Sequence, residues 1–221
     1  MAADAELTII GGAGFRTFRN IWMLEELGVP YRHLSVEPLS PEAKAVNPLG
    51  KVPSLKDGHL VLFESVAINT YLGDKFRGSG RPVLVPAVGT RQRAFFEQWN
   101  FFIQSELDAQ GLWICRKHRD MGHIFGVIPD AVEHAKKTFQ RCLKVVARDL
   151  QKTGGPYLLG KEFSATDILL VHCLNWAEVY SWFPAADAGS EMATLRDYFD
   201  RCRARDGFRR ATAIKQSQSK L

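Results

Sequence analysis

The hydrophobic pattern of this 221-residue chain changes once, near residue 78. Before this point, short apolar runs of strand length alternate with segments of helical periodicity, whereas beyond it apolar residues recur only at helical spacing. A stretch rich in helix breakers, Gly78-Ser79-Gly80-Arg81-Pro82 through Pro86 to Gly89, separates the two parts. The pattern therefore predicts an α/β domain at residues 1–77, a linker at 78–89 and an all-helical domain at 90–221.

The first part predicts the element order β-α-β-α-β-β-α. Leu7 to Ile10 has the apolar run of a buried strand, and a helix with apolar residues up to Leu27 follows, which Gly28 would cap. The remaining elements are a strand at Tyr31–Val36, a short helix at Pro41–Val46, two strands at Val52–Leu55 and Leu60–Leu62, and a helix from Ser65 to Phe76.

The helical part contains one sharply defined helix start. Ser164 and Asp167 have the spacing of a capping box, and the segment that follows them, Ile168 to Trp176, is apolar on most faces. We therefore expect a central helix there, with Asp167 as a structural acid.

The formal net charge of +5 and a pI of about 9.1 would suit an anionic partner. The surplus is local, because residues 1–77 hold 8 basic and 9 acidic side chains, whereas residues 196–220 alone hold 8 basic and 3 acidic ones. The signs alternate in that last stretch, which favours a solvated C-terminal helix and tail over a nucleic-acid groove. No nucleic-acid partner is expected.

Targeting and redox features point to an ordinary cytoplasmic protein. No run of about 18 apolar residues occurs, so neither a membrane span nor a membrane partner is expected. The N-terminal segment carries Asp4 and Glu6 where a targeting peptide has basic residues. The cysteines show neither C-x-x-C spacing nor partnering histidines, which predicts free thiols and no metal site at Cys115, Cys142, Cys173 and Cys202.

Two motifs carry possible binding chemistry. Residues 47–53 read Asn-Pro-Leu-Gly-Lys-Val-Pro, and a cis Val52–Pro53 peptide bond would turn the backbone of Val52 toward an open cleft, although a plain tight turn explains the motif equally well. Glu64-Ser65 stands at a helix start, where Ser65 could hold a carboxylate and Glu64 could face an ammonium group. From the residues alone, an ordinary N-cap role for Ser65 is the favoured interpretation.

Together these motifs resemble a soluble, cytosolic glutathione S-transferase of bacterial type. The resemblance runs from about Leu7 to Arg210 and rests on Asn47 to Leu55, Leu62-Phe63-Glu64-Ser65, Leu24-Glu25-Glu26-Leu27-Gly28 and the capping box. It implies a thioredoxin-like domain followed by a helical domain, a homodimer, and glutathione as cosubstrate without a metal. The activity it implies is conjugation of the glutathione thiolate to hydrophobic electrophiles, a detoxification reaction.

The resemblance also implies site residues. Val52, beside cis-Pro53, would pair by its backbone with the cysteinyl part of glutathione, Glu64 and Ser65 would hold the γ-glutamyl group, and Lys51 would meet the glycyl carboxylate. Phe15 would form a wall of the glutathione cleft. The electrophile pocket is implied at Trp113, Arg116, Trp176 and Tyr180.

The catalytic position departs from the family pattern. Members activate the thiol with a Tyr, Ser or Cys just after the first strand, and residues 12–19 here contain none of these. Arg16 could stabilise a thiolate by its charge and Thr17 by its hydroxyl in the first helical turn. Alternatively, Arg16 is a solvated charge and Thr17 is an N-cap.

Three other functions remain open. A glutathione-dependent peroxide or disulfide reductase would use the same thiolate, and a non-catalytic glutathione-binding or ligand-carrier module would need none of the missing catalytic residues. The spacing Gly12-x-Gly14-x-x-Thr17 followed by Glu37 also echoes a dinucleotide fingerprint, but the third glycine and a second βαβ half are missing.

Overall fold

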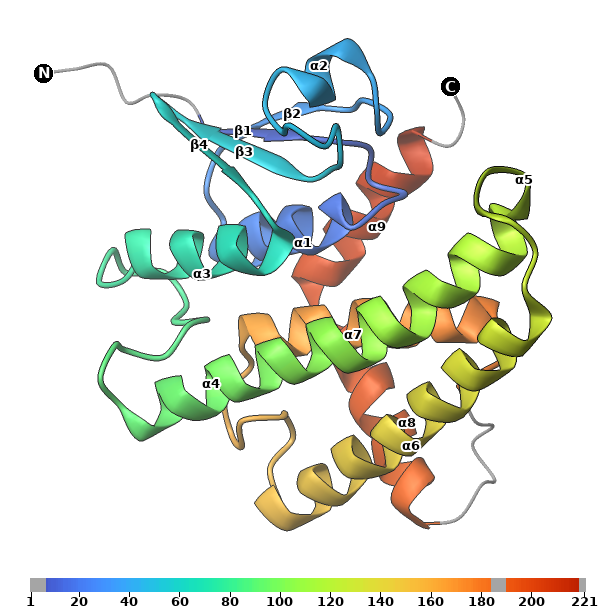
Figure 1. Cartoon of the computed structure of the whole chain (residues 1–221). Helices are drawn as coiled ribbons and strands as arrows, with labels where there is room; N and C mark the ends of the chain where they lie inside the picture. Colours follow the sequence, from blue (N-terminus) through green and yellow to red (C-terminus); the bar gives the residue numbers. More distant parts are fainter. Residues whose placement is uncertain (1–6, 184–189, 219–221) are drawn as a thin grey trace, which may run out of the picture. The chain divides into compact units, whose positions relative to one another are not determined.

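The computed structural model describes residues 7–183 and 190–218, which divide into two compact units (Figure 1). The first unit contains residues 7–85 and 203–218, and the second contains residues 86–183 and 190–202. The acidic N-terminal segment that includes Asp4 and Glu6, and Lys220 of the basic tail, lie outside the described residues.

The first unit is built on a four-stranded mixed sheet of order β2-β1-β3-β4. β1 (Thr8–Ile10) runs parallel to β2 (Arg32–Leu34) and antiparallel to β3 (Ser54–Asp57), which forms a hairpin with β4 (Leu60–Phe63). Figure 1 shows α1 (Thr17–Leu27) and α3 (Ser65–Lys75) below the sheet and α2 (Pro41–Lys44) above it. This is the predicted thioredoxin-like arrangement.

The C-terminal helix α9 (Asp206–Gln218) also belongs to the first unit, where it packs along α1 (Figure 1). The Phe208 ring lies edge-on to the rings of Phe18 and Trp22, with centroid distances of 5.7 and 4.9 Å. This contact explains why α1 is buried on most of its faces: it lies between the sheet and α9. The all-helical domain predicted at residues 90–221 therefore lacks its last helix.

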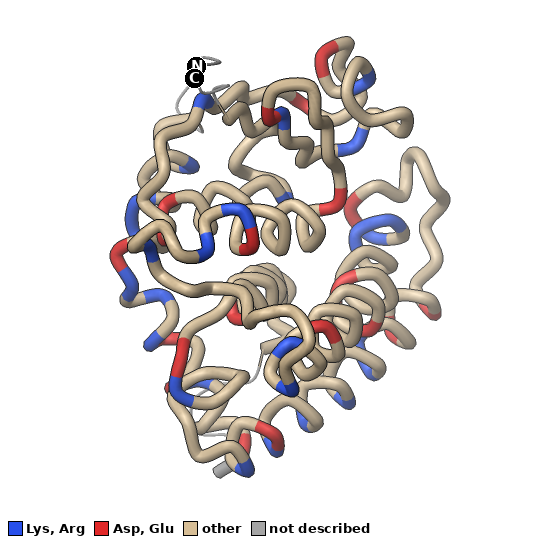
Figure 2. The backbone as a smooth tube through the Cα atoms, turned by 90° about the vertical axis from the view of Figure 1, so that its left-hand side faces the viewer, with Lys and Arg blue, Asp and Glu red and all other residues tan. Residues whose placement is uncertain are grey.

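Ion pairs hold α9 and the turn before it to α1. Arg205 contacts Glu26 at 2.7 Å and Arg210 contacts Glu25 at 2.7 Å. The prediction of a solvated C-terminal helix holds in part: Arg209, Arg210 and Lys215 are exposed, but Arg205 and Arg210 also pair with acids of a helix about 180 residues earlier in the chain. Elsewhere, basic and acidic segments are interspersed along the helices (Figure 2).

The expected linker is partly ordered into the first unit. Leu84 and Val85 are buried, the Val85 side chain packs against Gly73 of α3, and Arg77 donates a hydrogen bond to the Val85 carbonyl. The compact unit consequently extends to residue 85 rather than ending at 77.

The second unit is helical. α4 (Arg91–Phe102) continues through the π-helical stretches η1 (Ile103–Trp113) and η2 (Arg116–Asp120), and η1 packs against α6 and α7. The other helices are α5 (Gly122–Phe125), α6 (Pro129–Thr153), α7 (Ala165–Val179) and α8 (Ser190–Arg203).

The predicted capping box opens α7. Asp167 is fully buried and accepts hydrogen bonds from the backbone N–H groups of Leu158 (2.9 Å) and Ser164 (2.7 Å) and from the Tyr198 hydroxyl (2.9 Å). Burial raises the pKa of its carboxyl above the usual value, and the hydrogen bonds oppose this rise. The structural role predicted for Asp167 is confirmed.

The four cysteines are free thiols, as predicted. All four are buried, and burial raises the pKa of the Cys115 and Cys142 thiols. Among residues 7–183 and 190–218, no helix combines the length and the apolar character that a membrane crossing requires.

Candidate functional site

The loop between β1 and α1 brings three chain segments close together. Gly11 has a φ of 128°, and a Cβ placed on it would lie 2.6 Å from the Cβ of Val52 and closer still to the Thr17 hydroxyl. Only glycine therefore allows the strand end to approach both the residue before Pro53 and the first turn of α1.

The two catalytic candidates differ in access. Arg16 is half-buried, whereas Thr17 is fully buried and its hydroxyl has no hydrogen-bond partner in the part of the chain that the structure describes. Arg16 occupies the N-cap position without a side-chain capping bond, so the alternative in which Thr17 is an N-cap is wrong. A thiolate could reach the Thr17 hydroxyl only if the covering atoms moved, whereas Arg16 is only half-buried.

Hydrogen bonds engage four amides of the loop, and the N–H groups of Gly11 and Gly12 donate to the carbonyls of Leu34 and Val36 (2.9 Å each). The Phe15 N–H donates to the Gly12 carbonyl (3.2 Å), and the Ala13 N–H donates to Oε1 of Gln218 at the end of α9 (2.9 Å). The Phe15 side chain is half-buried, and its ring packs beside Gly12. The Phe15 N–H therefore closes a turn within the loop.

The Val52–Pro53 peptide bond is cis, as the resemblance implied. It precedes β3, with Val52 half-buried and Lys51 exposed. The side-chain amide of Asn47 donates to the Lys51 carbonyl (3.1 Å), and its oxygen accepts from the Leu49 N–H (3.0 Å). Asn47 thus fixes the loop that presents Val52.

Glu64 has an unusual backbone conformation, with φ 72° and ψ 111°, immediately before α3. A non-glycine residue with such dihedrals costs about 1–3 kcal/mol and is typical of ligand-binding positions. Its side chain is exposed. Because Glu64 takes the N-cap position, Ser65 is the first residue of the helix and its N-cap interpretation is wrong.

A buried polar cluster that the sequence analysis missed connects the first turns of α1 and α3. Arg19, of which 1% is exposed, donates from its guanidinium to the Ser65 hydroxyl (3.1 Å). Asn20 donates to the Ser65 carbonyl (2.8 Å) and to the Asn69 side chain (2.7 Å). A signal was present, because Arg19 and Asn20 are followed directly by the apolar run Ile21 to Leu24 in the same helix.

Arg19 places a buried positive charge at the N-terminus of α3. The helix dipole adds partial positive charge at the same end, so both favour an anion beside Ser65. Ser65 itself is buried, with 4% of its surface exposed. The first unit therefore combines a cis-proline loop, a strained acid and a positively charged helix start.

Three of the four residues predicted for the electrophile pocket cluster in the second unit. The Arg116 guanidinium lies 5.9 Å from the ring centroid of Trp176, which is 6.0 Å from that of Tyr180. The Tyr180 hydroxyl donates to Asp120 (2.6 Å). Burial raises the pKa of Tyr180, and the hydrogen bond to Asp120 raises it further. Trp113 instead packs against Phe125 at 6.4 Å.

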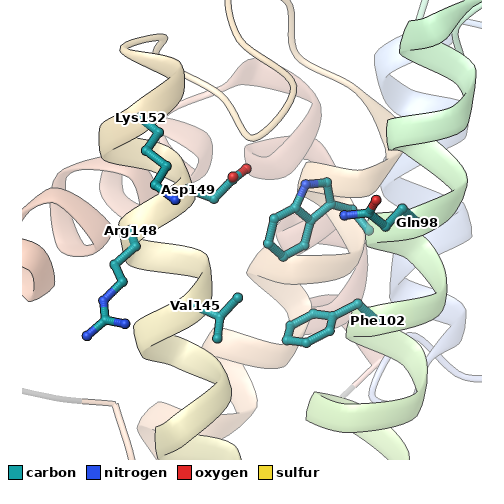
Figure 3. A pocket seen from close by; sticks show the side chains of 7 residues that line it. Gln98, Phe102, Val145, Arg148, Asp149 and Lys152 are labelled. Atoms are coloured by element: carbon teal, nitrogen blue, oxygen red, sulfur yellow. The ribbon is translucent and has the colours of Figure 1, made fainter.

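A separate groove of about 320 Å³ lies between α4 and α6 (Figure 3). In Figure 3, Phe102 of α4 and Val145 of α6 point toward each other across it. The groove contains none of the four residues predicted for the electrophile; its lining is Gln98, Trp99, Phe102, Val145, Arg148, Asp149 and Lys152.

Comparisons with known proteins agree on one family. The family model "Glutathione S-transferase, N-terminal domain" matches residues 16–75, and "Glutathione S-transferase, C-terminal domain" matches residues 129–204. The glutathione S-transferase-like protein OpS6 of Beauveria bassiana is 31% identical over 159 residues, which cover 67% of this chain and 68% of that protein. Glutathione S-transferase A of Pleuronectes platessa is 30% identical over 135 residues, covering 58% of this chain and 56% of that protein, less than two thirds of its length.

Solved structures share the fold. The glutathione transferase URE2P6 of Phanerochaete chrysosporium, in complex with oxidized glutathione, has a TM-score of 0.82 at 21% identity, with 98% of this chain and 99% of that chain covered. Ure2p in complex with glutathione has a TM-score of 0.82 at 20% identity, with 96% and 100% covered. The matched domains, in the order that the structure shows, and the shared fold lead to one assignment: this chain belongs to the glutathione S-transferase family.

Proposed function

We propose that this protein binds glutathione on its first unit and transfers the thiolate to hydrophobic electrophiles, as a cytoplasmic homodimeric glutathione transferase. The observation that carries the proposal is the start of α3, where the positive φ of Glu64 precedes a Ser65 that is hydrogen-bonded to the buried Arg19. Such a site suits a ligand that carries both a carboxylate and an ammonium group, as the γ-glutamyl end of glutathione does.

The remaining contacts follow from this placement. Ser65 and the Arg19 charge hold the γ-glutamyl carboxylate, while the exposed Glu64 side chain meets the ammonium group. Val52, with cis-Pro53 beside it, pairs by its backbone with the cysteinyl part, and Lys51 reaches the glycyl carboxylate.

The chemistry then depends on the thiolate. A free thiol has a pKa near 8.5, and a helix N-terminus with a neighbouring cation lowers it by about one unit or more. Arg16 at the N-cap of α1 supplies that cation. The sulfur attacks an electrophilic carbon, the leaving group departs with its electron pair, and a thioether is released.

A non-catalytic glutathione-binding module is the second candidate. The loop lacks the usual Tyr, Ser or Cys, and the Thr17 hydroxyl is covered. A glutathione-dependent reductase would start from the same thiolate, but the thiolate would attack a peroxide oxygen or a disulfide sulfur, and a second glutathione thiol would complete the reduction by forming glutathione disulfide.

Three measurements distinguish these candidates: calorimetry with glutathione, turnover of an activated aryl halide and of a peroxide, and ultraviolet titration of the bound thiol. We expect binding and aryl halide turnover, and we expect Arg16→Ala to raise the pKa of the bound thiol by about one unit. Arg32→Ala, an exposed arginine on β2, is the matched control. Binding without turnover would select the carrier module, turnover of the peroxide alone would select the reductase, and failure to bind glutathione would refute all three.

A further inference from the structure

The end of α9 reaches the loop from which α1 begins. Oε1 of Gln218 accepts the Ala13 N–H (2.9 Å), and Nε2 of Gln218 lies 3.1 Å from Nδ1 of His33. Nε2 of His33 lies 2.8 Å from the Gly11 carbonyl. Three hydrogen bonds thus connect α9, β2 and the loop in a closed chain, which we call the Gln218–His33 clamp.

The Ala13 N–H and the Gly11 carbonyl, at the two ends of the clamp, determine which atom donates in each of its hydrogen bonds. A backbone N–H can only donate and a carbonyl can only accept, so Oε1 of Gln218 faces Ala13 and the proton of His33 is on Nε2. His33 then accepts at Nδ1 from the Gln218 amide. A neutral imidazole and a primary amide satisfy all three bonds, whereas Glu at position 218 could not donate to Nδ1.

The clamp is held in place from both sides. His33 lies in the middle of β2, in register with Ile9 of β1. On the other side, Phe208 and the Arg210–Glu25 ion pair fix α9 on α1. Gln218 follows Arg210 by 8 residues in the same helix, or about 12 Å of rise, so α9 acts as a rigid arm that carries the amide to the loop.

The loop needs such support. Gly11, Gly12 and Gly14 allow its backbone many conformations. The two bonded atoms, the Gly11 carbonyl and the Ala13 N–H, flank Gly12, just after β1 ends at Ile10. The Gly11 and Gly12 N–H groups already donate to the Leu34 and Val36 carbonyls (2.9 Å each). The clamp adds the bonds of the Gly11 carbonyl and the Ala13 N–H, which lead toward the start of α1.

We propose that Gln218 and His33 are positioning residues for the glutathione thiolate: they hold the Gly11–Phe15 loop so that the N-terminus of α1 meets the sulfur. This inference rests on the proposed glutathione transferase function. It predicts a larger effect on kcat than on glutathione affinity, because most residues proposed to bind the peptide, Ser65, Glu64 and Val52, lie on other segments than the loop that holds Phe15.

The test compares separate variants of the full chain with the wild type. We expect Gln218→Ala and His33→Leu each to lower kcat with an activated aryl halide roughly 10-fold, and to raise the pKa of the bound thiol, while the glutathione Kd changes less than about 2-fold. The double variant should be no worse than either single one, because both remove the same support. His33→Gln, which can donate and accept at the same positions, should recover part of kcat. Gln216→Ala, exposed on the same helix, is the control.

Two spectroscopic measurements separate positioning from general stability. The ¹⁵N shifts of the His33 ring should report a proton on Nε2 in the wild type, and Ala13 amide exchange should become at least about 10-fold faster in Gln218→Ala at an unchanged Tm. If kcat, thiol pKa and Ala13 exchange in Gln218→Ala all match the wild type, the inference is wrong. If the wild type binds glutathione without turnover, the transferase proposal fails. The role of the clamp can then still be tested by comparing the Ala13 amide exchange rate and the pKa of the bound thiol between Gln218→Ala and the wild type.

Discussion

Arg19 carries its charge with 1% of its surface exposed, and its bond to Ser65 directs that charge to the start of α3. We predict that Arg19→Met, which keeps most of the volume but removes the cation, weakens glutathione binding about 10- to 100-fold, the effect of one charge-assisted hydrogen bond. Calorimetry measures the Kd, and circular dichroism checks folding. Arg19→Lys keeps the charge and should bind with intermediate affinity. An unchanged Kd in a folded Arg19→Met protein would contradict the placement of the carboxylate.

The second unit also buries a charged residue type, the acid Asp167. Removing its side chain leaves the Leu158 and Ser164 N–H groups without their partner, so Asp167→Ala should lower the free energy of unfolding by about 3 kcal/mol. Urea denaturation provides the value. Asp197→Ala, an exposed acid on α8, should change it by less than about 0.5 kcal/mol.

The same carboxyl predicts a pH dependence. Its pKa is raised in the folded state, mainly by burial, so the folded protein retains a proton that the unfolded chain loses above pH about 4. Stability from this group is fully present below that pH and declines as pH rises through the folded pKa. Asp167→Asn should flatten this part of the stability profile, measured by urea denaturation from pH about 4 to about 7. A profile of the same slope in both proteins would refute the raised pKa.

Single residues also show where sequence reasoning ends. The 47–53 motif and Glu64-Ser65 could be recognised because their residues are neighbours in the chain. His33 and Gln218 are 185 residues apart and could not, because no local pattern connects them. The burial of Arg19 could have been suspected from its apolar surroundings in α1, but its partner Ser65 could not.

Among the elements, α1 was predicted nearly to its ends because its apolar spacing and Gly28 are local signals. The π-helical stretches η1 and η2 were not predicted, since a 3.6-residue period does not distinguish them from α-helix. The position of α9 was missed for a different reason: alternating charges indicate solvent exposure unless acids elsewhere in the chain pair with them, as Glu25 and Glu26 do.

The contact of α9 with α1 gives a prediction for an element. Phe208 is buried against Phe18 and Trp22, so Phe208→Ala should cost about 3 kcal/mol and loosen α9. Urea denaturation measures the cost, and Val179→Ala, at a residue that is 76% exposed, should have little effect. Because α9 carries Gln218, Ala13 amide exchange should also accelerate in Phe208→Ala. Unaltered stability would mean that the packing of α9 contributes nothing.

At the scale of the molecule, the chain returns at residue 203 to the unit with which it began, and composition could not predict this. Truncation after Cys202 removes α9, which uncovers Trp22 and leaves the carboxylates of Glu25 and Glu26 without their arginines. We expect Tm to fall by roughly 10 °C, at about 2–4 °C for each kcal/mol lost. Tryptophan fluorescence should shift to longer wavelength as Trp22 meets water. Truncation after Gln218, which keeps all of α9, should leave both quantities unchanged. If the chain ending at Cys202 melted like the full-length protein, the first unit would be complete without its last helix.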